Sequence, residues 1–322
     1  MKSTVLILFI FAATVASCFA QAAMPINPGM QMLETENYAD ARAYFQSLLQ
    51  KDPRNTEAVA DMAKLCLAQG QNKMGVRWAQ KAVALAPNHA AYELLLGDAY
   101  GHYVNDVGIF SKFSIARKIR GAYQKAVQLD PNNFKARYRL ATYYLEAPGI
   151  AGGSTAKADA QIQILDKSDP VEADWLRAKA AVQHRDNKKA GAYLHSAIKL
   201  DKTAKSEARL GSFLERQKRY AKAFTVFEDS VHKDPTYSES YYQIGLSALL
   251  GKIHVQEGIR AMQEYLTMPH DWESGAPYTW AHYRLGMLYG LAGEKTSEKV
   301  QYEAALKLDP GFKQARKALA EM

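Results

Sequence analysis

The chain has 322 residues, of which 48% are hydrophobic, 23% charged and 11% aromatic, a composition typical of soluble globular proteins. It contains only 11 Pro and 20 Gly and is rich in good helix formers, which excludes disordered and collagen-like chains and favours long helices. Lys and Arg outnumber Asp and Glu by 41 to 33, and because this net charge of +8 is diffuse, we expect no nucleic-acid binding.

Residues 1–22 have the pattern of a secretory signal peptide. Lys2 gives a positive start, an apolar run extends from Val5 to Ala16, and Ala20-Gln21-Ala22 is a small-x-small cleavage site. The run is too short to span the ~30 Å hydrocarbon core of a bilayer. No later stretch is apolar enough to do so either, so we expect no transmembrane helix in a mature protein that is exported across the bacterial inner membrane.

The two cysteines have different interpretations. Val15-Ala16-Ser17-Cys18 also resembles a bacterial lipobox, in which Cys18 becomes the lipidated first residue, so a soluble periplasmic form and a lipoprotein both stay open. After removal of the leader only Cys66 remains, which rules out an intramolecular disulfide. Cys66 lies in an apolar helical pattern, and we predict a buried thiol rather than a nucleophile.

Proline signals end successive helical patterns along the rest of the chain. They stand at Pro53, Pro87, Pro131, Pro170, Pro235, Pro269 and Pro310, so the gaps are 34, 44, 39, 65, 34 and 41 residues. The gap of 65 holds two units of about 34 residues, with Leu200-Asp201-Lys202 where other units have Leu-Asp-Pro. The pattern predicts a protein built from internal repeats.

The residues inside each unit recur at fixed spacings. The sixth unit has Leu210-Gly211, then Ala223 and Phe227, before Pro235. The third, fourth and eighth units have Leu96-Gly97, Leu140-Ala141 and Leu285-Gly286 at the matching place. A small residue there lets two helices approach closely, and Pro stops the second helix. The pattern resembles the tetratricopeptide repeat family, which implies an all-α, right-handed superhelical solenoid of about eight helix-turn-helix repeats with a C-terminal capping helix.

The resemblance covers a single domain, residues 23–322. Residues 23–55 are expected to form a degenerate first repeat, because Pro25 and Pro28 leave little room for its first helix. The remaining repeats are expected in residues 56–310 and the capping helix in 311–322. Extra residues near 103–116, 147–154 and 268–278 are expected in loops.

The insert near 103–116 has two interpretations. It leads into a stretch without an acid between residues 107 and 125, and it contains Phe110 and Phe113. Cations beside apolar rings suit peripheral contact with anionic lipid headgroups or an anionic partner. We favour the other interpretation, a lengthened second helix with a solvated charged face and both rings folded under the loop.

The other inserts carry no recognisable chemistry. Residues 147–154 lack the Gly-Lys-Ser/Thr ending of a phosphate loop and are predicted to form a turn, with Ser154 as the N-cap of a helix. His270, Asp271 and Glu273 are too few ligands, in one short loop, for a metal site. The eight His form no paired metal motif, and the serine-acylase spacings lack their partner motifs. We expect no catalytic residue, no metal and no cofactor.

The resemblance implies that the first helices line a concave groove and carry the partner-binding residues. The fifth position of four first helices is aromatic: Tyr138, Trp175, Tyr242 and Tyr283. Basic residues accompany these rings: Lys135, Arg139, Lys205 and Arg209, with Lys179 and Arg216 also favouring acidic groups. The alternative is that the rings pack against the next hairpin and that the charges form a solvated face.

These features predict a non-enzymatic scaffold or adaptor of the bacterial cell envelope, periplasmic, secreted or lipid-anchored, that holds a peptide or helix of a protein partner in the aromatic groove. The alternative is a small-ligand or lipid-handling accessory protein, in which the inserts of units three and four close one end of the groove. A deep, closed apolar pocket would favour the ligand and an open trough the peptide. An enzyme ranks third.

Overall fold

The structure is a computed structural model that describes residues 27–273 and 275–322, and within these residues all regular elements are helices. The helices pair into eight hairpins, α1 (Pro28–Glu34) with α2 (Tyr38–Lys51), α3 (Thr56–Ala68) with α4 (Asn72–Leu85), α5 (Ala90–Tyr103) with α6 (Ile109–Leu129), α7 (Phe134–Glu146) with α8 (Thr155–Asp166), α9 (Pro170–Gln183) with α10 (Asn187–Leu200), α11 (Ala204–Arg216) with α12 (Tyr220–Lys233), α13 (Ser238–Gly251) with α14 (Val255–Tyr265), and α15 (Tyr278–Leu291) with α16 (Lys295–Leu308). The α17 helix (Lys313–Ala320) covers the last hairpin. The predicted all-α solenoid is confirmed.

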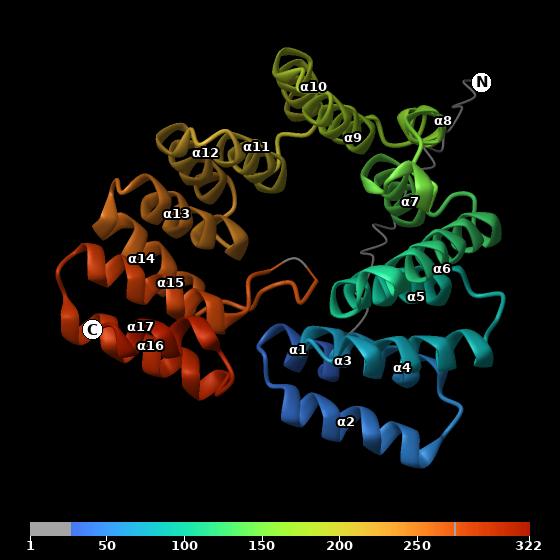
Figure 1. Ribbon diagram of the computed structural model, residues 1–322, viewed down its shortest axis with the longest axis horizontal. Coiled ribbons are helices and arrows are strands. Elements are labelled where there is room, and N and C mark those ends of the chain that lie inside the picture. The colour runs from blue at the N-terminus through green and yellow to red at the C-terminus, as the bar shows by residue number, and fades with distance from the viewer. Residues whose placement is uncertain (1–26, 274) are drawn as a thin grey trace, which may run out of the picture.

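The hairpins follow one another around an open centre, with the first helices turned towards it and α10 and α12 on the outside (Figure 1). None of the helices in the described ranges is long and apolar enough to cross a membrane. The predicted signal peptide and Cys18 lie outside the described residues. Cys66 is buried in α3.

Small residues set the spacing inside each hairpin. A Cβ on Gly97 would lie 2.4 Å from the Tyr123 ring, and one on Gly211 would lie 2.6 Å from the Phe227 ring. Both rings belong to the second helix of the same hairpin and are buried. The Leu-Gly pairs of the sequence are therefore positions where an aromatic ring of the second helix lies directly on the backbone of the first.

Several of the first helices begin at a residue whose side chain caps the helix. Asn133 accepts a hydrogen bond from the Ala136 amide at the start of α7, and Asp169 accepts one from the Glu172 amide at the start of α9. Pro170 is the first residue of α9, whereas α8 already ends at Asp166. Pro170 is thus a helix-starting proline, which the sequence pattern had placed at a helix end.

The first two inserts form a helical extension and a turn. The α6 helix has 21 residues, but its buried residues begin only at Ile115, and Phe110 is 91% exposed. The expectation that Phe110 and Phe113 fold under the loop is wrong, because α6 begins beyond the end of α5 and its first turn lacks a facing helix. The second insert contains a short 3₁₀ turn, η2 (Gly149–Ala151), and Ser154 accepts a hydrogen bond from the Lys157 amide at the start of α8.

The third insert joins the two ends of the solenoid. The loop between α14 and α15 reaches across the inside of the arc towards α3 and α5 (Figure 1). The His270 amide donates to the Glu34 carbonyl at 3.1 Å, and the Tyr278 amide donates to the Glu36 carboxylate at 2.8 Å. Trp272 packs against the cores of the N-terminal hairpins. These contacts close the arc into a ring.

Candidate functional site

The concave surface carries a pocket of about 210 Å³ where α7, α9 and α11 meet. Its wall consists of aromatic, aliphatic and basic side chains, namely Tyr138, Trp175, Ala178, Lys179, Val182, Leu194, Arg209, Ser212, Phe213 and Arg216. The lining contains no Asp or Glu. A basic site with apolar walls complements an acidic ligand that also has an apolar or aromatic side chain.

Trp175 forms the rigid part of this wall. The residue is 8% exposed and belongs to a buried cluster against which Leu210 and Phe213 of the next hairpin pack. The Arg209 guanidinium lies 5.1 Å from the ring centroid and pairs with Glu172 at 2.8 Å. The Trp175 indole N–H is buried and has no hydrogen-bond partner in the described part of the chain. Trp175 therefore supports the pocket through its packing and holds Arg209 in place.

The other two cations of the pocket are more available to a partner. Lys179 pairs with Glu146 at 2.6 Å, and the Glu146 side chain is more than half exposed, so this ion pair is open to exchange. Arg216 is exposed at the end of α11. It forms no ion pair with any residue that the structure describes. Lys205 is exposed near the start of α11 and does not line the pocket.

The basic pair of α7 holds an acidic side chain of the α14–α15 loop. Lys135 donates hydrogen bonds to both carboxylate oxygens of Glu273, at 2.9 and 2.8 Å, and an Arg139 nitrogen lies 3.5 Å from the same carboxylate. Arg139 also pairs with Asp98 of α5 at 3.1 Å. Lys135 and Arg139, two of the residues predicted from the sequence to bind a partner, thus bind the α14–α15 loop of the same chain.

The Asp98 side chain is mostly buried and lies beside this loop. Burial raises the pKa of the Asp98 carboxyl above its ordinary range, although the Arg139 charge and the Tyr123 hydroxyl lower it. The Tyr123 hydroxyl donates to Asp98 at 2.7 Å, and burial also raises the pKa of Tyr123. Because Asp98 accepts from Tyr123 and pairs with Arg139, and Arg139 also contacts Glu273, this cluster anchors the loop.

Tyr242 and Tyr283 lie apart from the pocket. Tyr242 is buried, its ring lies 5.2 Å from that of Tyr265, and its hydroxyl accepts a hydrogen bond from Arg284. Tyr283 packs against Trp280, Tyr302 and Phe312 at the C-terminal end. The structure therefore brings together only Tyr138 and Trp175 of the four rings.

Sequence reasoning missed Phe213 and Glu273. Phe213 lies four residues after Arg209, on the same face of α11, so extending the predicted groove residues by one helical turn would have found it. Glu273 had no signal of its own, because its contact with α7 depends on how the whole ring closes. No group of three or more His, Cys, Asp or Glu within residues 27–273 and 275–322 is arranged to hold a metal ion.

Comparison with known families identifies the repeat in four places. Tetratricopeptide repeat models match residues 32–100, 122–160, 176–238 and 281–312, which together make up more than half of the chain. No curated protein matches the chain in sequence.

Solved structures resemble the chain in fold at low identity. A human IFIT1 dimer with m7Gppp-AAAA is 15% identical over 91% of this chain and 70% of that chain, with a TM-score of 0.54. A monomeric IFIT1 mutant with Gppp-AAAA is 15% identical over 87% of this chain and 67% of its own, with a TM-score of 0.51. The chain spans about half of Cut9-Hcn1, at 54% of that chain, 15% identity and a TM-score of 0.48. These likenesses concern the fold alone.

Proposed function

The chain belongs to the tetratricopeptide repeat family, a fold of protein–protein interaction scaffolds, and we propose that it holds an extended, acidic segment of a partner protein on its concave surface. The binding surface is the pocket between α7, α9 and α11. No catalytic family is among the matches, and the proposed role is non-enzymatic.

The observation that carries this proposal is the contact of the Glu273 carboxylate with Lys135 and Arg139. A loop bounded by Pro269 and Pro277 lies on the concave surface, and Glu273, which stands in a turn of this loop, places its carboxylate between Lys135 and Arg139. The pocket farther along the surface offers the same chemistry, with Lys179, Arg209 and Arg216 beside aromatic rings and no acid in the lining. An acidic segment of a partner finds there the kind of contact that the loop makes next to it.

The size of the pocket favours a peptide over a small ligand. At about 210 Å³ it is smaller than the ~300–1,000 Å³ of ordinary small-molecule sites. The insert that lies on the concave surface is the α14–α15 loop, whereas η2 of the second insert lies beside the outer helix α6. The alternative function, a ligand pocket closed by the inserts of units three and four, therefore has less support.

The bacterial cell envelope is the proposed setting. It rests on the signal-peptide pattern of residues 1–22, with Cys18 as the anchor if the lipobox is used. Expression of the full chain with Cys18 or with Cys18→Ser, followed by cell fractionation, tests it. Export of both forms supports the setting, and retention of both in the cytoplasm contradicts it.

A binding measurement tests the concave site. The probe is a fluorescein-labelled acidic peptide with one Phe and several Pro, which prevent it from forming a helix. Arg216→Glu is expected to weaken binding about tenfold or more, because it replaces an attractive charge with a repulsive one at the pocket. The matched control is Arg77→Glu, the same change at an exposed position of α4.

Fluorescence anisotropy at two salt concentrations supplies the dissociation constants. Binding that falls with salt and with Arg216→Glu, but not with Arg77→Glu, supports the proposal. Equal losses in both variants, or equal binding of a peptide with Gln in place of the acids, would contradict it.

A further inference from the structure

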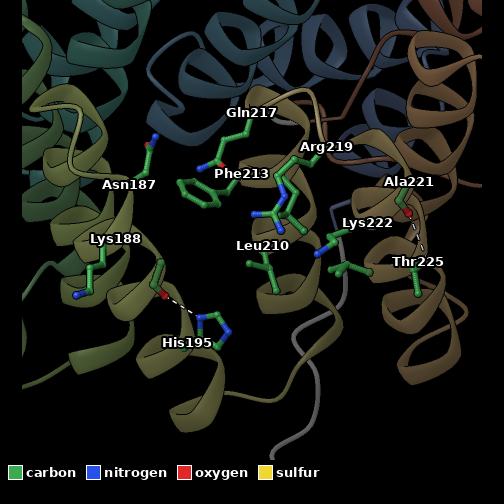
Figure 2. A pocket seen from close by; sticks show the side chains of 13 residues that line it. Asn187, Lys188, His195, Leu210, Phe213, Gln217, Arg219, Ala221, Lys222 and Thr225 are labelled. Atoms are coloured by element: carbon green, nitrogen blue, oxygen red, sulfur yellow. Dashed lines mark hydrogen bonds between the residues drawn. The ribbon is translucent and has the colours of Figure 1, made fainter.

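A second and larger cavity lies on the outer side of the ring. It has a volume of about 800 Å³ and is lined by residues of α10, α11 and α12 (Figure 2). It opens where the hairpin α9–α10 is followed by the hairpin α11–α12. The site therefore lies on the opposite side of α11 from the concave pocket, with Phe213 in the wall of both.

The two hairpins separate more widely here than elsewhere along the solenoid. Leu200, the last residue of α10, is 56% exposed. Leu85, at the same place in α4, packs into the core of the next hairpin. The sequence carries the corresponding signal, since Lys202 replaces the Pro that follows Asp in the neighbouring units. The outer surface consequently has a gap that no helix of the described chain fills.

The floor of the cavity is an apolar stripe on α11. Leu210, Phe213 and Leu214 have the i, i+3, i+4 spacing of one helical face and all line the cavity. Val226 of α12 extends the apolar surface. Figure 2 shows Leu210 and Phe213 between the side chains of α10 and those of α12.

The rim of the cavity is basic. Lys188 and His195 stand on the α10 side, and Arg219 and Lys222 stand on the side of α12 (Figure 2). Lys188, Arg219 and Lys222 are exposed and form no ion pair within the described ranges. The thirteen lining residues include no Asp or Glu. An occupant with acidic groups on both flanks complements this rim.

The shape of the cavity suits a helix. Its lining residues follow helical spacing along α10 and α11, and those from Leu210 to Gln217, the C-cap of α11, extend about 10 Å. An added Cβ on Gly191 of α10 would meet nothing within 4 Å, so a partner backbone has room to approach α10 there. Three helices around an open apolar trough match the groove that receives an amphipathic helix.

We propose that this cavity binds an acidic amphipathic helix of a partner protein. The helix lays apolar residues at i, i+3 and i+4 on Leu210, Phe213 and Leu214, and its carboxylates face Lys188, Arg219 and Lys222. A second copy of this chain fits less well, because the basic rim and the net charge of +8 oppose self-association. The protein thus has two binding surfaces, a concave one for an extended acidic segment and an outer one for a helix.

A substitution that places a large side chain of this protein in the cavity tests the proposal. In Gly191→Trp the new ring enters the open space beside Gly191. The matched control is Gly121→Trp on α6, where an added Cβ also meets nothing within 4 Å. Neither variant should lower the melting temperature, because both replace a helical Gly with a better helix former.

The probe is a helical, fluorescein-labelled peptide with Leu at three- and four-residue spacing and Glu on its other face. Wild type and Gly121→Trp are expected to bind it alike, while Gly191→Trp and the double variant Lys188→Glu, Lys222→Glu weaken binding at least about tenfold. Undiminished binding by Gly191→Trp would overturn the proposal. It is also overturned if the same peptide with Lys for Glu binds as tightly, if Arg216→Glu in the concave pocket abolishes binding, or if lauric acid displaces the peptide.

Discussion

At the scale of single residues, the repeat motif is a set of close contacts. Gly97, Gly211 and Gly286 each lie under an aromatic ring of the second helix, at distances where a Cβ has no room. The same motif places Trp175 and Tyr242 inside the packing between hairpins. Truncation of either ring costs on the order of 3–5 kcal/mol of folding free energy, so such variants report on stability before they report on binding.

Gly211→Ala tests the close-contact explanation. The new methyl group would lie 2.6 Å from the buried Phe227 ring, and we expect the free energy of unfolding to fall by about 1–3 kcal/mol although Ala is the better helix former. Gly121→Ala, in open space on α6, should raise it by up to about 1 kcal/mol. Urea denaturation measures both, and a stabilised Gly211→Ala would contradict the explanation.

At the scale of elements, the first turn of α6 differs from the rest of the solenoid. Ile109 and Phe110 project from it with 62% and 91% of their surfaces exposed, and Lys112 and Lys118 follow on the same helix. Apolar tips next to cations suit the surface of an anionic bilayer. The peripheral membrane contact considered from the sequence therefore remains as a proposal for this element.

Phe110→Asp tests that contact. The exposed ring contributes little to folding, so the variant should melt like wild type but lose co-sedimentation with vesicles that contain phosphatidylglycerol. Leu308→Asp, at another exposed apolar position at the end of α16, is the control and should keep binding. The proposal fails if wild type does not sediment with these vesicles, or if the control loses as much binding as Phe110→Asp.

The sequence predicted the features that depend on contacts within a single repeat unit. Spacing alone identified the hairpins, because Gly211 needs only Phe227 of its own unit, and it identified Ser154 as a helix cap. The sequence did not predict contacts between repeats that are far apart along the chain. The contact of Glu273 with Lys135, 138 residues away, depends on the rotation between successive hairpins, which no local pattern contains.

At the scale of the whole molecule, a few contacts close the ring. His270 is buried between the two ends of the solenoid, and its Nε2 lies 2.9 Å from the Glu36 carboxylate. Burial alone would lower the pKa of His270, but the hydrogen bond and charge of Glu36, together with the Asp271 carbonyl and Glu239, outweigh it and raise the pKa above its ordinary value. Closure of the ring is therefore coupled to protonation of His270.

This coupling predicts a pH-dependent stability. Because the folded-state pKa is raised, the stabilisation from protonated His270 is fully present below the unfolded-state pKa and is lost as the pH rises through the folded-state pKa. Relative to His270→Gln, wild type should lose stability between pH 5.5 and pH 9. Urea denaturation of both proteins measures this difference, and a difference that stays constant or grows with pH would contradict the prediction.

The central claim is that the concave surface of α7, α9 and α11 holds an extended acidic segment. The most direct test is photo-crosslinking of the proline-containing acidic peptide with a benzophenone in place of its Phe, followed by mass spectrometry of the crosslinked fragments. We predict crosslinks in the helices around Tyr138, Trp175 and Val182, and their loss in Arg216→Glu. Crosslinks confined to the outer helices α10 and α12, or unchanged in Arg216→Glu, would contradict the account.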